Sequence, residues 1–320
     1  MRSLAPDNLA ASRDGARHWS RIGEATCVWG IWWLYAVHRV LGRSVFRVAL
    51  YPVVMYYWLA RPVARRASLD YLRRLHRTAG DHVVPGARHT LRHLYAFAET
   101  LLDKLLAISG RYPFENVARE GVEVLERQLD TGRGGIIVTA HMGCLELCRA
   151  LAQKRAGLRL TVLVHTAHAQ RFNRMLSRLD ADSTLQLLQI DDITPATAQQ
   201  LADRVNAGEF VAIAGDRIPV HGGRTVTVPF LGAPAQFPIG PYVLAALLDC
   251  PLFAMGCIRQ GDGHLLRFTE LAREVALPRA RRTEALAHHA SAYAAWLEGL
   301  LVQSPYDWFN FYDFWASPNP

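Results

Sequence analysis

The sequence predicts an α/β protein whose mainly parallel, layered sheet is flanked by helices and preceded by a helical, membrane-associating region. From about residue 120, strand-like and helix-like runs alternate, and several strand-like runs are apolar throughout. Such alternation is typical of parallel α/β folds, and strands covered on both faces lack a polar side. A basic segment rich in Trp and Tyr before residue 60 predicts the membrane-associating region.

The N-terminal part of the chain divides into a polar segment, residues 1–25, and a helical, aromatic-rich region, residues 26–115. Two apolar blocks at 27–37 and 48–60 are separated by arginines, and neither reaches the roughly 20 residues that a helix needs to cross hydrocarbon. Trp and Tyr beside Arg favour the headgroup level of a membrane. Two alternatives stay open, a pair of buried core helices or a single tilted span.

Helices are predicted at 68–78 and 88–108, with glycine and proline between them. The α/β domain is predicted over 116–320, continuous with the helical region. Its expected strands are 134–140, 159–166, 185–190, 209–216, 225–231, 251–260 and 263–272. Its expected helices are 144–153, 171–179, 194–208, 239–250 and 282–301.

Charge is distributed unevenly along the chain, which has a formal net charge of +8. Residues 1–120 carry 18 basic and 9 acidic side chains, whereas residues 121–320 carry 18 and 19. A basic N-terminal third indicates an anionic partner, either a membrane surface or nucleic acid. The five cysteines form no CxxC pattern, and no secretory signal is recognisable, so we expect chemistry that faces the cytosol.

The stretch GGIIVTAHMGCLE predicts a strand that ends at His141, a turn at Gly143 and a helix that carries Glu146. Ligands of parallel sheets bind at the carboxyl ends of the strands. A carboxylate bonded to one ring nitrogen fixes the histidine tautomer and leaves the other nitrogen free to take a proton. We therefore expect His141 to act as a base and Glu146 to orient it; the alternative is an ordinary surface or core pair.

The HMGCLE hexapeptide resembles the H-x4-D/E motif of the glycerolipid and lysophospholipid acyltransferase superfamily. The branch that contains the bacterial lipid A late acyltransferases is the more similar one. The later stretch AGDRIPVHGGRTVTVPFLGAPAQFPIGPYVLAALLDC is similar to a second block of that branch. The resemblance covers roughly residues 20–315, and two blocks in this order are a more specific signal than either alone.

The resemblance implies His141 as general base, Glu146 as its partner and a set of substrate-binding residues. These are Arg171, Asn173, Asp216, Arg217, Arg224, Gly232 and Gly240. An alternative for Arg224 is a simple ion pair with Asp216, and the two glycines have alternatives as turn and helix-entry residues. The chain departs from the family where Arg217 follows the acid and where the C-terminal tail is acidic and aromatic.

The implied reaction is the transfer of an acyl chain from an acyl-carrier-protein or acyl-CoA thioester to a hydroxyl of a lipid or glycolipid. The resemblance places it at the cytoplasmic face of the cell inner membrane, with a peripheral or single-span attachment. No cofactor is implied. No metal is expected either, because His165 and His168 lack further ligands at suitable spacing.

Two other classes of protein remain as alternatives. A serine-type hydrolase or thioesterase would need a nucleophilic serine after a strand, and the sequence has no G-x-S-x-G motif. A nucleic-acid-binding protein could use the basic N-terminal third, but that region is apolar and has no recognised binding motif, so we expect no nucleic acid partner.

Overall fold

The computed structural model describes residues 24–80, 84–148, 159–164, 186–189, 194–218 and 223–316. The chain divides into two compact units, one that ends at Tyr56 and one that runs from Tyr57 to Pro320. The second unit contains the helices that precede the sheet as well as the sheet itself. Arg171 and Asn173 lie outside the described residues, as do the predicted helix 171–179 and the second half, 149–153, of the predicted helix 144–153.

Helix α2 (Glu24–Ala60) provides the described part of the first unit. It is kinked at Gly42, whose φ of 80° and ψ of −180° are not helical, and Pro52 lies inside its second half. Several large apolar and aromatic side chains of the helix are exposed: Trp33, Val40, Leu41, Val45, Val48, Tyr51, Met55 and Tyr56. Across the described residues, no helix combines the length and apolarity that a membrane crossing requires.

The two helices predicted before the sheet are present as α3 (Pro62–Ala79) and α4 (Ala87–Ile108). Pro62 begins α3, and Gly80 ends it in the left-handed conformation that glycine adopts most easily. The two helices pack against each other. Because both also contribute buried residues to the second unit, they belong to the body that carries the sheet.

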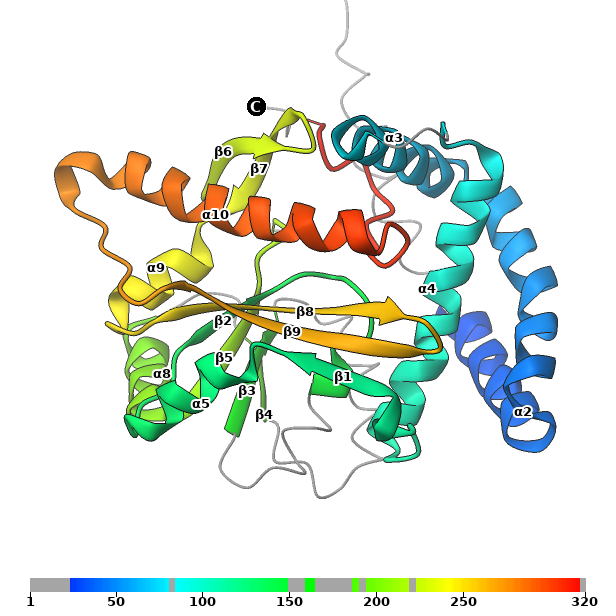
Figure 1. Ribbon diagram of the computed structural model, residues 1–320, viewed down its shortest axis with the longest axis horizontal. Coiled ribbons are helices and arrows are strands. Elements are labelled where there is room, and N and C mark those ends of the chain that lie inside the picture. Colours follow the sequence, from blue (N-terminus) through cyan, green and yellow to red (C-terminus); the bar gives the residue numbers. More distant parts are fainter. Residues whose placement is uncertain are drawn as a thin grey trace, which may run out of the picture. The chain divides into compact units, whose positions relative to one another are not determined.

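The main sheet has the strand order β1-β9-β8-β2-β5-β3-β4 (Figure 1). Its strands are β1 (Val117–Glu120), β2 (Ile136–Thr139), β3 (Arg159–Val164), β4 (Gln186–Gln189), β5 (Glu209–Ala214), β8 (Leu252–Gln260) and β9 (Gly263–Ala272). All neighbours pair in parallel except β8 and β9, which form an antiparallel hairpin. The predicted, mainly parallel sheet is confirmed for the described strands.

Helices cover both faces of the sheet (Figure 1). Helix α10 (Arg282–Gln303) lies over β8 and β9 on one face, and α5 (Val122–Asp130) lies on the other. The remaining elements are α8 (Pro195–Asn206), α9 (Gly240–Leu247), η1 (Phe114–Asn116) and η2 (Arg279–Arg281). A hairpin of β6 (Thr225–Phe230) and β7 (Ala233–Pro238) packs against α10.

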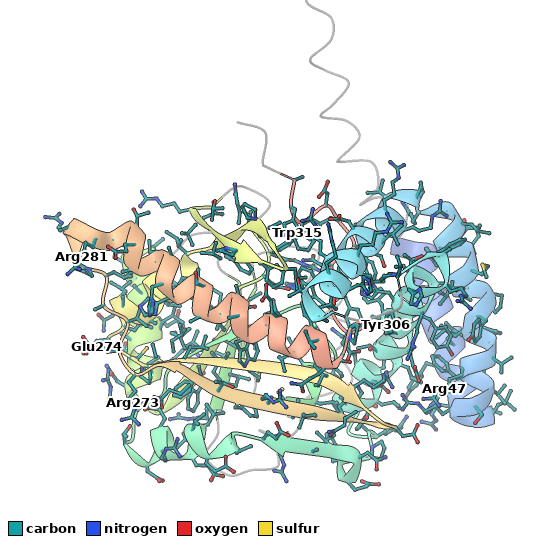
Figure 2. All side chains as sticks on the ribbon, turned by 45° about the horizontal axis from the view of Figure 1, so that its top comes forward. Arg47, Arg273, Glu274, Arg281, Tyr306 and Trp315 are labelled. Atoms are coloured by element: carbon teal, nitrogen blue, oxygen red, sulfur yellow. The ribbon has the colours of Figure 1, made fainter. Side chains whose placement is uncertain are left out.

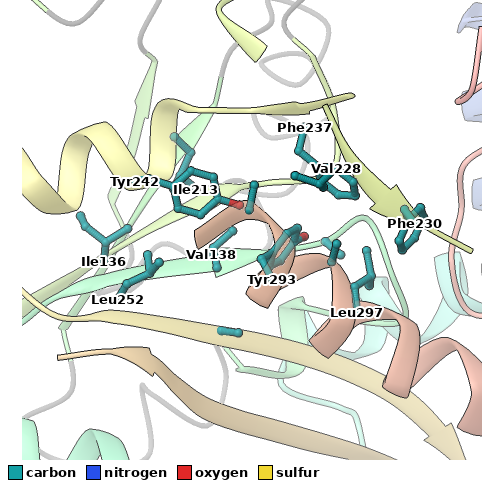
Figure 3. Packing of buried hydrophobic residues seen from close by; sticks show 14 of the residues in the cluster. Ile136, Val138, Ile213, Val228, Phe230, Phe237, Tyr242, Leu252, Tyr293 and Leu297 are labelled. Atoms are coloured by element: carbon teal, nitrogen blue, oxygen red, sulfur yellow. The ribbon is translucent and has the colours of Figure 1, made fainter. Parts of the chain in front are cut away.

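The core lies between α10, the β6–β7 hairpin and the central strands, where Val138, Ile213 and Tyr293 are buried (Figure 3). All four residues of β2 (IIVT) are buried, and three of them are apolar, as expected for a strand that is covered on both faces. The sequence did not predict β1, α5 or β7. β1 is short and carries polar side chains, and β7 has proline at its second and last positions, so neither has the signal of an ordinary strand.

Candidate active site

His141 stands just beyond the carboxyl end of β2, at the centre of the sheet. The parallel neighbours β5 and β8 hold β2 on both sides, so its end is firmly placed. Gly143 follows with φ of 52°, and a Cβ there would meet the Cys257 carbonyl oxygen at 1.9 Å. Only glycine allows this turn to pass so close to β8.

Asp216 lies just beyond the carboxyl end of β5, beside His141. The two residues are joined twice: the His141 backbone N–H donates to Asp216 Oδ2 at 2.8 Å, and His141 Nδ1 lies 2.7 Å from Asp216 Oδ1. Asp216 is 1% exposed, whereas 38% of the His141 side chain is exposed. The imidazole is therefore held by a buried carboxylate on its Nδ1 side, while part of the ring is accessible to solvent.

Burial alone would raise the pKa of Asp216, but the charge and hydrogen bonds of His141, together with the charge of Arg217, outweigh it and lower that pKa to about 2. Asp216 is therefore an ionised acceptor near neutral pH. An ionised Oδ1 takes its hydrogen bond from Nδ1–H of the imidazole. This tautomer leaves His141 Nε2 without a proton, as a general base requires.

The prediction that Glu146 contacts the imidazole is wrong. Glu146 Oε1 instead forms an ion pair with Lys104 Nζ of α4 at 3.1 Å, and its Oε2 lies 3.9 Å from Cys144 Sγ. Burial alone would lower the pKa of Lys104, but the charge of Glu146 outweighs it and raises that pKa. The place beside His141 belongs to Asp216, which was expected to bind substrate.

Glu146 does not reach the imidazole because tail contacts fix the backbone directly after His141. The helical turn begins only after these contacts, at Glu146. Met142 forms an antiparallel bridge with Trp308, and Gly143 N–H donates to the Asp307 carbonyl at 2.8 Å. The turn therefore starts later than the sequence predicted, and Glu146 faces α4 instead of the imidazole.

A base at the carboxyl edge of an α/β sheet, steadied by a buried carboxylate, is suited to taking a proton from a hydroxyl group. A family model for bacterial lipid A biosynthesis acyltransferases matches residues 107–317. The chain belongs to this family. No curated protein sequence matches the chain significantly.

Membership of the lipid A biosynthesis acyltransferases confirms the resemblance predicted from HMGCLE and the second block. The family implies an acyltransferase that acts on a lipid. The matched region begins in α4 and extends into the C-terminal tail, so it contains His141, Asp216 and Glu146. It also contains most of the aromatic residues of that tail.

The tail of this acyltransferase, residues 304–316, runs back against the site. Its Phe309 N–H donates to the His141 carbonyl at 2.8 Å, and the Trp308 indole N–H donates to Asp216 Oδ2 at 2.9 Å. Arg74 stacks over Trp315 at 4.4 Å and Arg92 over Tyr306 at 4.5 Å. Figure 2 shows where Trp315 and Tyr306 lie. The aromatic side chains of the tail therefore pack on the domain.

Of the two predicted substrate-binding arginines that the structure describes, Arg217 and Arg224, it is Arg217 that lies beside the dyad. Its charge lowers the pKa of Asp216, and its Nη2 donates to the Phe309 carbonyl at 2.9 Å. Its Nε is buried and has no hydrogen-bond partner among the described residues. Arg224 is exposed at the start of the β6–β7 hairpin and forms no ion pair with Asp216 in the described structure.

The two predicted glycines have clear backbone roles. Leu231 and Gly232, with φ of 48° and 75°, form the two-residue turn between β6 and β7. Positive φ at both positions is typical of a type I′ hairpin turn. Gly240 is the first residue of α9, where a Cβ would make only ordinary contact with Ile213. The described contacts of both glycines fit their turn and helix-entry alternatives.

The remaining observations concern cysteines and possible metal ligands. Cys144 and Cys148 are buried, and burial is the main cause of their raised thiol pKa. His165 and His168 lie outside the described residues. Within the described ranges, no three side chains of His, Cys, Asp or Glu gather at a spacing suited to a metal ion.

Sequence reasoning missed the role of Asp216 beside the histidine and the contact of Trp308 with Asp216. A signal for the first was available, because Asp216 follows an apolar strand just as His141 does. Ends of adjacent parallel strands meet at one edge of a sheet. The contact of Trp308 had no local signal, since it depends on how the tail folds back.

Proposed function

We propose that this acyltransferase moves an acyl chain from a thioester donor to a hydroxyl group of a lipid or glycolipid acceptor, with His141 as the general base. The observation that carries the proposal is the 2.7 Å contact between His141 Nδ1 and the buried Asp216 at the carboxyl ends of two adjacent strands. Family membership supports the reaction class.

In the proposed reaction, His141 Nε2 takes the proton of the acceptor hydroxyl. The oxygen of that hydroxyl attacks the carbonyl carbon of the thioester at the same time. The tetrahedral intermediate then collapses, the carbon–sulfur bond breaks, and the departing thiolate takes the proton from the imidazolium. The products are an ester and a free thiol. Asp216 stabilises the imidazolium between the two steps and keeps the ring in the required tautomer. A nucleophilic serine is not needed, because the acceptor supplies the oxygen.

Arginines are proposed to neutralise the negative charge that the reaction develops or that the acceptor carries. Arg217 is the first candidate, because it lies beside the dyad and keeps a buried Nε–H without a partner in the described structure. Arg224 is exposed and is better suited to an anionic head group. Arg171 and Asn173 remain predicted substrate contacts.

The donor is proposed to be an acyl-carrier protein or acyl-CoA. Residues 1–120 carry twice as many basic as acidic side chains, which suits an acidic carrier protein as well as an anionic membrane surface. Transfer from purified acyl-carrier protein and from acyl-CoA, measured side by side, distinguishes the two donors.

We place the enzyme at the cytoplasmic face of the inner membrane, attached through α2. Exposed Trp33, Tyr51 and Tyr56 on a helix that also carries arginines are suited to the headgroup level. The test is sedimentation with vesicles that contain anionic lipid, in low and high salt. Binding that resists high salt supports insertion of the aromatic side chains, and complete release by salt contradicts it.

The decisive test of the reaction is mass spectrometry of total lipids from cells with and without the intact gene. The deletion is expected to lose one acylated lipid, and a His141→Ala variant is expected to behave like the deletion. The matched control is His288→Ala, because His288 is exposed on α10 and belongs to no part of the proposed site. Full restoration of the lipid by His141→Ala would show that His141 is not the base.

The alternative function, hydrolysis of a thioester, can be tested directly on the purified protein. Among the described residues, no serine hydroxyl is hydrogen-bonded to His141. Purified enzyme with a thioester donor and a lipid acceptor should yield acylated lipid. Free fatty acid as the sole product, at the same rate with and without acceptor, would favour hydrolysis.

A further inference from the structure

The carboxylate of Asp216 is held in one orientation by two donors on the same oxygen. Oδ2 accepts the His141 backbone N–H at 2.8 Å and the Trp308 indole N–H at 2.9 Å. This leaves Oδ1 for the imidazole Nδ1 at 2.7 Å. A carboxylate can rotate about its last bond, so the two donors on Oδ2 decide which oxygen faces the ring.

One of these donors belongs to the sheet, and the other comes from the tail. The backbone N–H follows β2 and is fixed by the parallel pairing of that strand with β5 and β8. Trp308 reaches Asp216 across 92 positions of sequence, and its side chain is 0% exposed. The orientation of Asp216 therefore depends on the tail being in place.

Hydrogen bonds from α3 and α4 hold the backbone of the tail at Trp308. Its carbonyl oxygen accepts His93 Nε2–H at 2.8 Å, and Ser68 Oγ lies 2.8 Å from His93 Nδ1. Burial is the main cause that lowers the pKa of His93, to about 4, so its ring is neutral near pH 7. A neutral ring with Nε2–H must accept from Ser68 at Nδ1, which fixes the direction of both bonds.

Aromatic packing fixes the plane of the Trp308 ring. Tyr71, Phe230 and Phe314 lie against it at ring-centre distances of 5.0, 5.6 and 5.0 Å, all with edge-to-face geometry. The Tyr71 hydroxyl also donates to the Pro305 carbonyl at 2.9 Å. Such an enclosed indole has little freedom to turn its N–H away from Asp216.

We propose that Trp308 is a positioning residue of the acyltransferase: its indole N–H keeps Asp216 in the orientation that holds His141 ready as a base. Ser68 of α3 and His93 of α4 hold Trp308 through the hydrogen bond to its carbonyl oxygen. Both helices therefore influence the His141–Asp216 dyad indirectly, through the tail. This proposal rests on the proposed function of His141. It gives the aromatic tail a role in the reaction beyond packing.

The test compares Trp308→Phe with Trp315→Phe. Both variants lose an indole N–H from the same aromatic cluster, but the Trp315 N–H donates to the Phe230 carbonyl at 3.3 Å and not to Asp216. Trp308→Phe is expected to lower kcat about 10- to 100-fold with little change in KM, since a hydrogen bond to a charged group is lost. Trp315→Phe is expected to retain most of kcat.

The pH profile separates positioning from a general loss of structure. Without the indole donor the Asp216 carboxylate becomes a stronger base and holds the imidazolium proton more tightly. The acid limb of kcat/KM should therefore move to higher pH in Trp308→Phe and stay in place in Trp315→Phe. The other ionisable groups whose charges interact with Asp216 are Arg217, Tyr293 and Tyr312, and neither variant replaces them.

A measurement without substrate keeps this inference apart from the proposed function. NMR of the His141 ring nitrogens, assigned with His141→Ala, should show a larger change from the wild type in Trp308→Phe than in Trp315→Phe. Equal ring spectra and equal kcat in the two variants would overturn the role of Trp308. Activity that survives His141→Ala would instead overturn the proposed function.

If Trp308→Phe does not fold, substitutions of His93 decide the question. His93→Leu removes the donor to the Trp308 carbonyl, whereas His93→Gln keeps an N–H group near the position of Nε2. His93→Leu is expected to lower kcat further than His93→Gln and to move the acid limb upward. The same kcat and pH profile in both folded variants would contradict the proposal.

Discussion

Two segments leave the carboxyl edge of the sheet side by side, and each brings one carboxylate. The segment after β2 carries Glu146, five positions beyond His141, and the segment after β5 carries Asp216, 75 positions away. The near carboxylate pairs with Lys104, and the distant one pairs with the imidazole. Proximity along the chain was therefore the weaker guide, because adjacent parallel strands end at one edge.

The two carboxylates also differ in how completely they are enclosed. Asp216 is 1% exposed and accepts hydrogen bonds from His141 and Trp308, whereas the side chains of Glu146 and Lys104 both keep some contact with solvent. A fully buried carboxylate with charged and hydrogen-bonded partners has a fixed orientation. We therefore propose that Asp216 acts with His141 in the reaction, whereas Glu146 contributes a structural ion pair with Lys104.

The largest effect on kcat should come from replacing one of the two carboxylates, Asp216, by its amide, compared with the same change at Glu146. Asp216→Asn is expected to lower kcat about 10²- to 10⁴-fold, because the amide no longer stabilises the imidazolium and can select the wrong tautomer. Glu146→Gln is expected to lower kcat far less. Steady-state kinetics on both variants, with circular dichroism as a check of folding, measures the difference. A greater loss in Glu146→Gln would reverse the assignment.

The second prediction concerns stability at low pH. Because the folded pKa of Asp216 is about 2, below its ordinary value of 3.8, its stabilisation is present above pH 3.8 and is lost as the pH falls through 2. The shift corresponds to about 2 kcal/mol. Urea unfolding from pH 5 to pH 2 should show a steeper decline for the wild type and Glu146→Gln than for Asp216→Asn. Equal slopes in all three proteins would contradict it.

The third prediction tests the ion pair of the first segment. Glu146→Gln leaves the ammonium of Lys104 without its partner and is expected to cost about 1–3 kcal/mol of unfolding free energy. Replacing both residues, as in Lys104→Met with Glu146→Gln, should cost less than the sum of the single changes. Urea unfolding of the four proteins gives the coupling energy. Strict additivity would show that the pair does not act as a unit.

The smallest effect is expected from the arginine that stands apart from both segments. Arg224→Gln should raise KM for an anionic acceptor several-fold and leave kcat nearly unchanged, since an exposed arginine contributes mainly to binding. The matched variant Arg217→Gln should lower kcat as well, because Arg217 lies beside Asp216. Initial rates at varied acceptor concentration separate the two. Identical effects would remove the distinction between them.

Much of the sheet domain could be predicted because its signals are local. Mostly apolar runs such as 136–139 identify buried parallel strands, and the stripe of α3 at Tyr71, Leu72 and Leu75 identifies a packed helix. The position of His141 after such a run predicted a site at the carboxyl edge. β1 and β7 were missed because their short, polar or proline-containing sequences depend on their neighbours for strand structure.

The sequence by itself determined the α/β class, the place of His141 and, through two motifs, the acyltransferase family. Only the tertiary structure decided that Asp216 and not Glu146 meets the imidazole, and that Trp308 meets Asp216. The physical reason is that hydrophobic periodicity is a property of one segment. The choice of hydrogen-bond partner depends on which strands become neighbours and on where the tail is held.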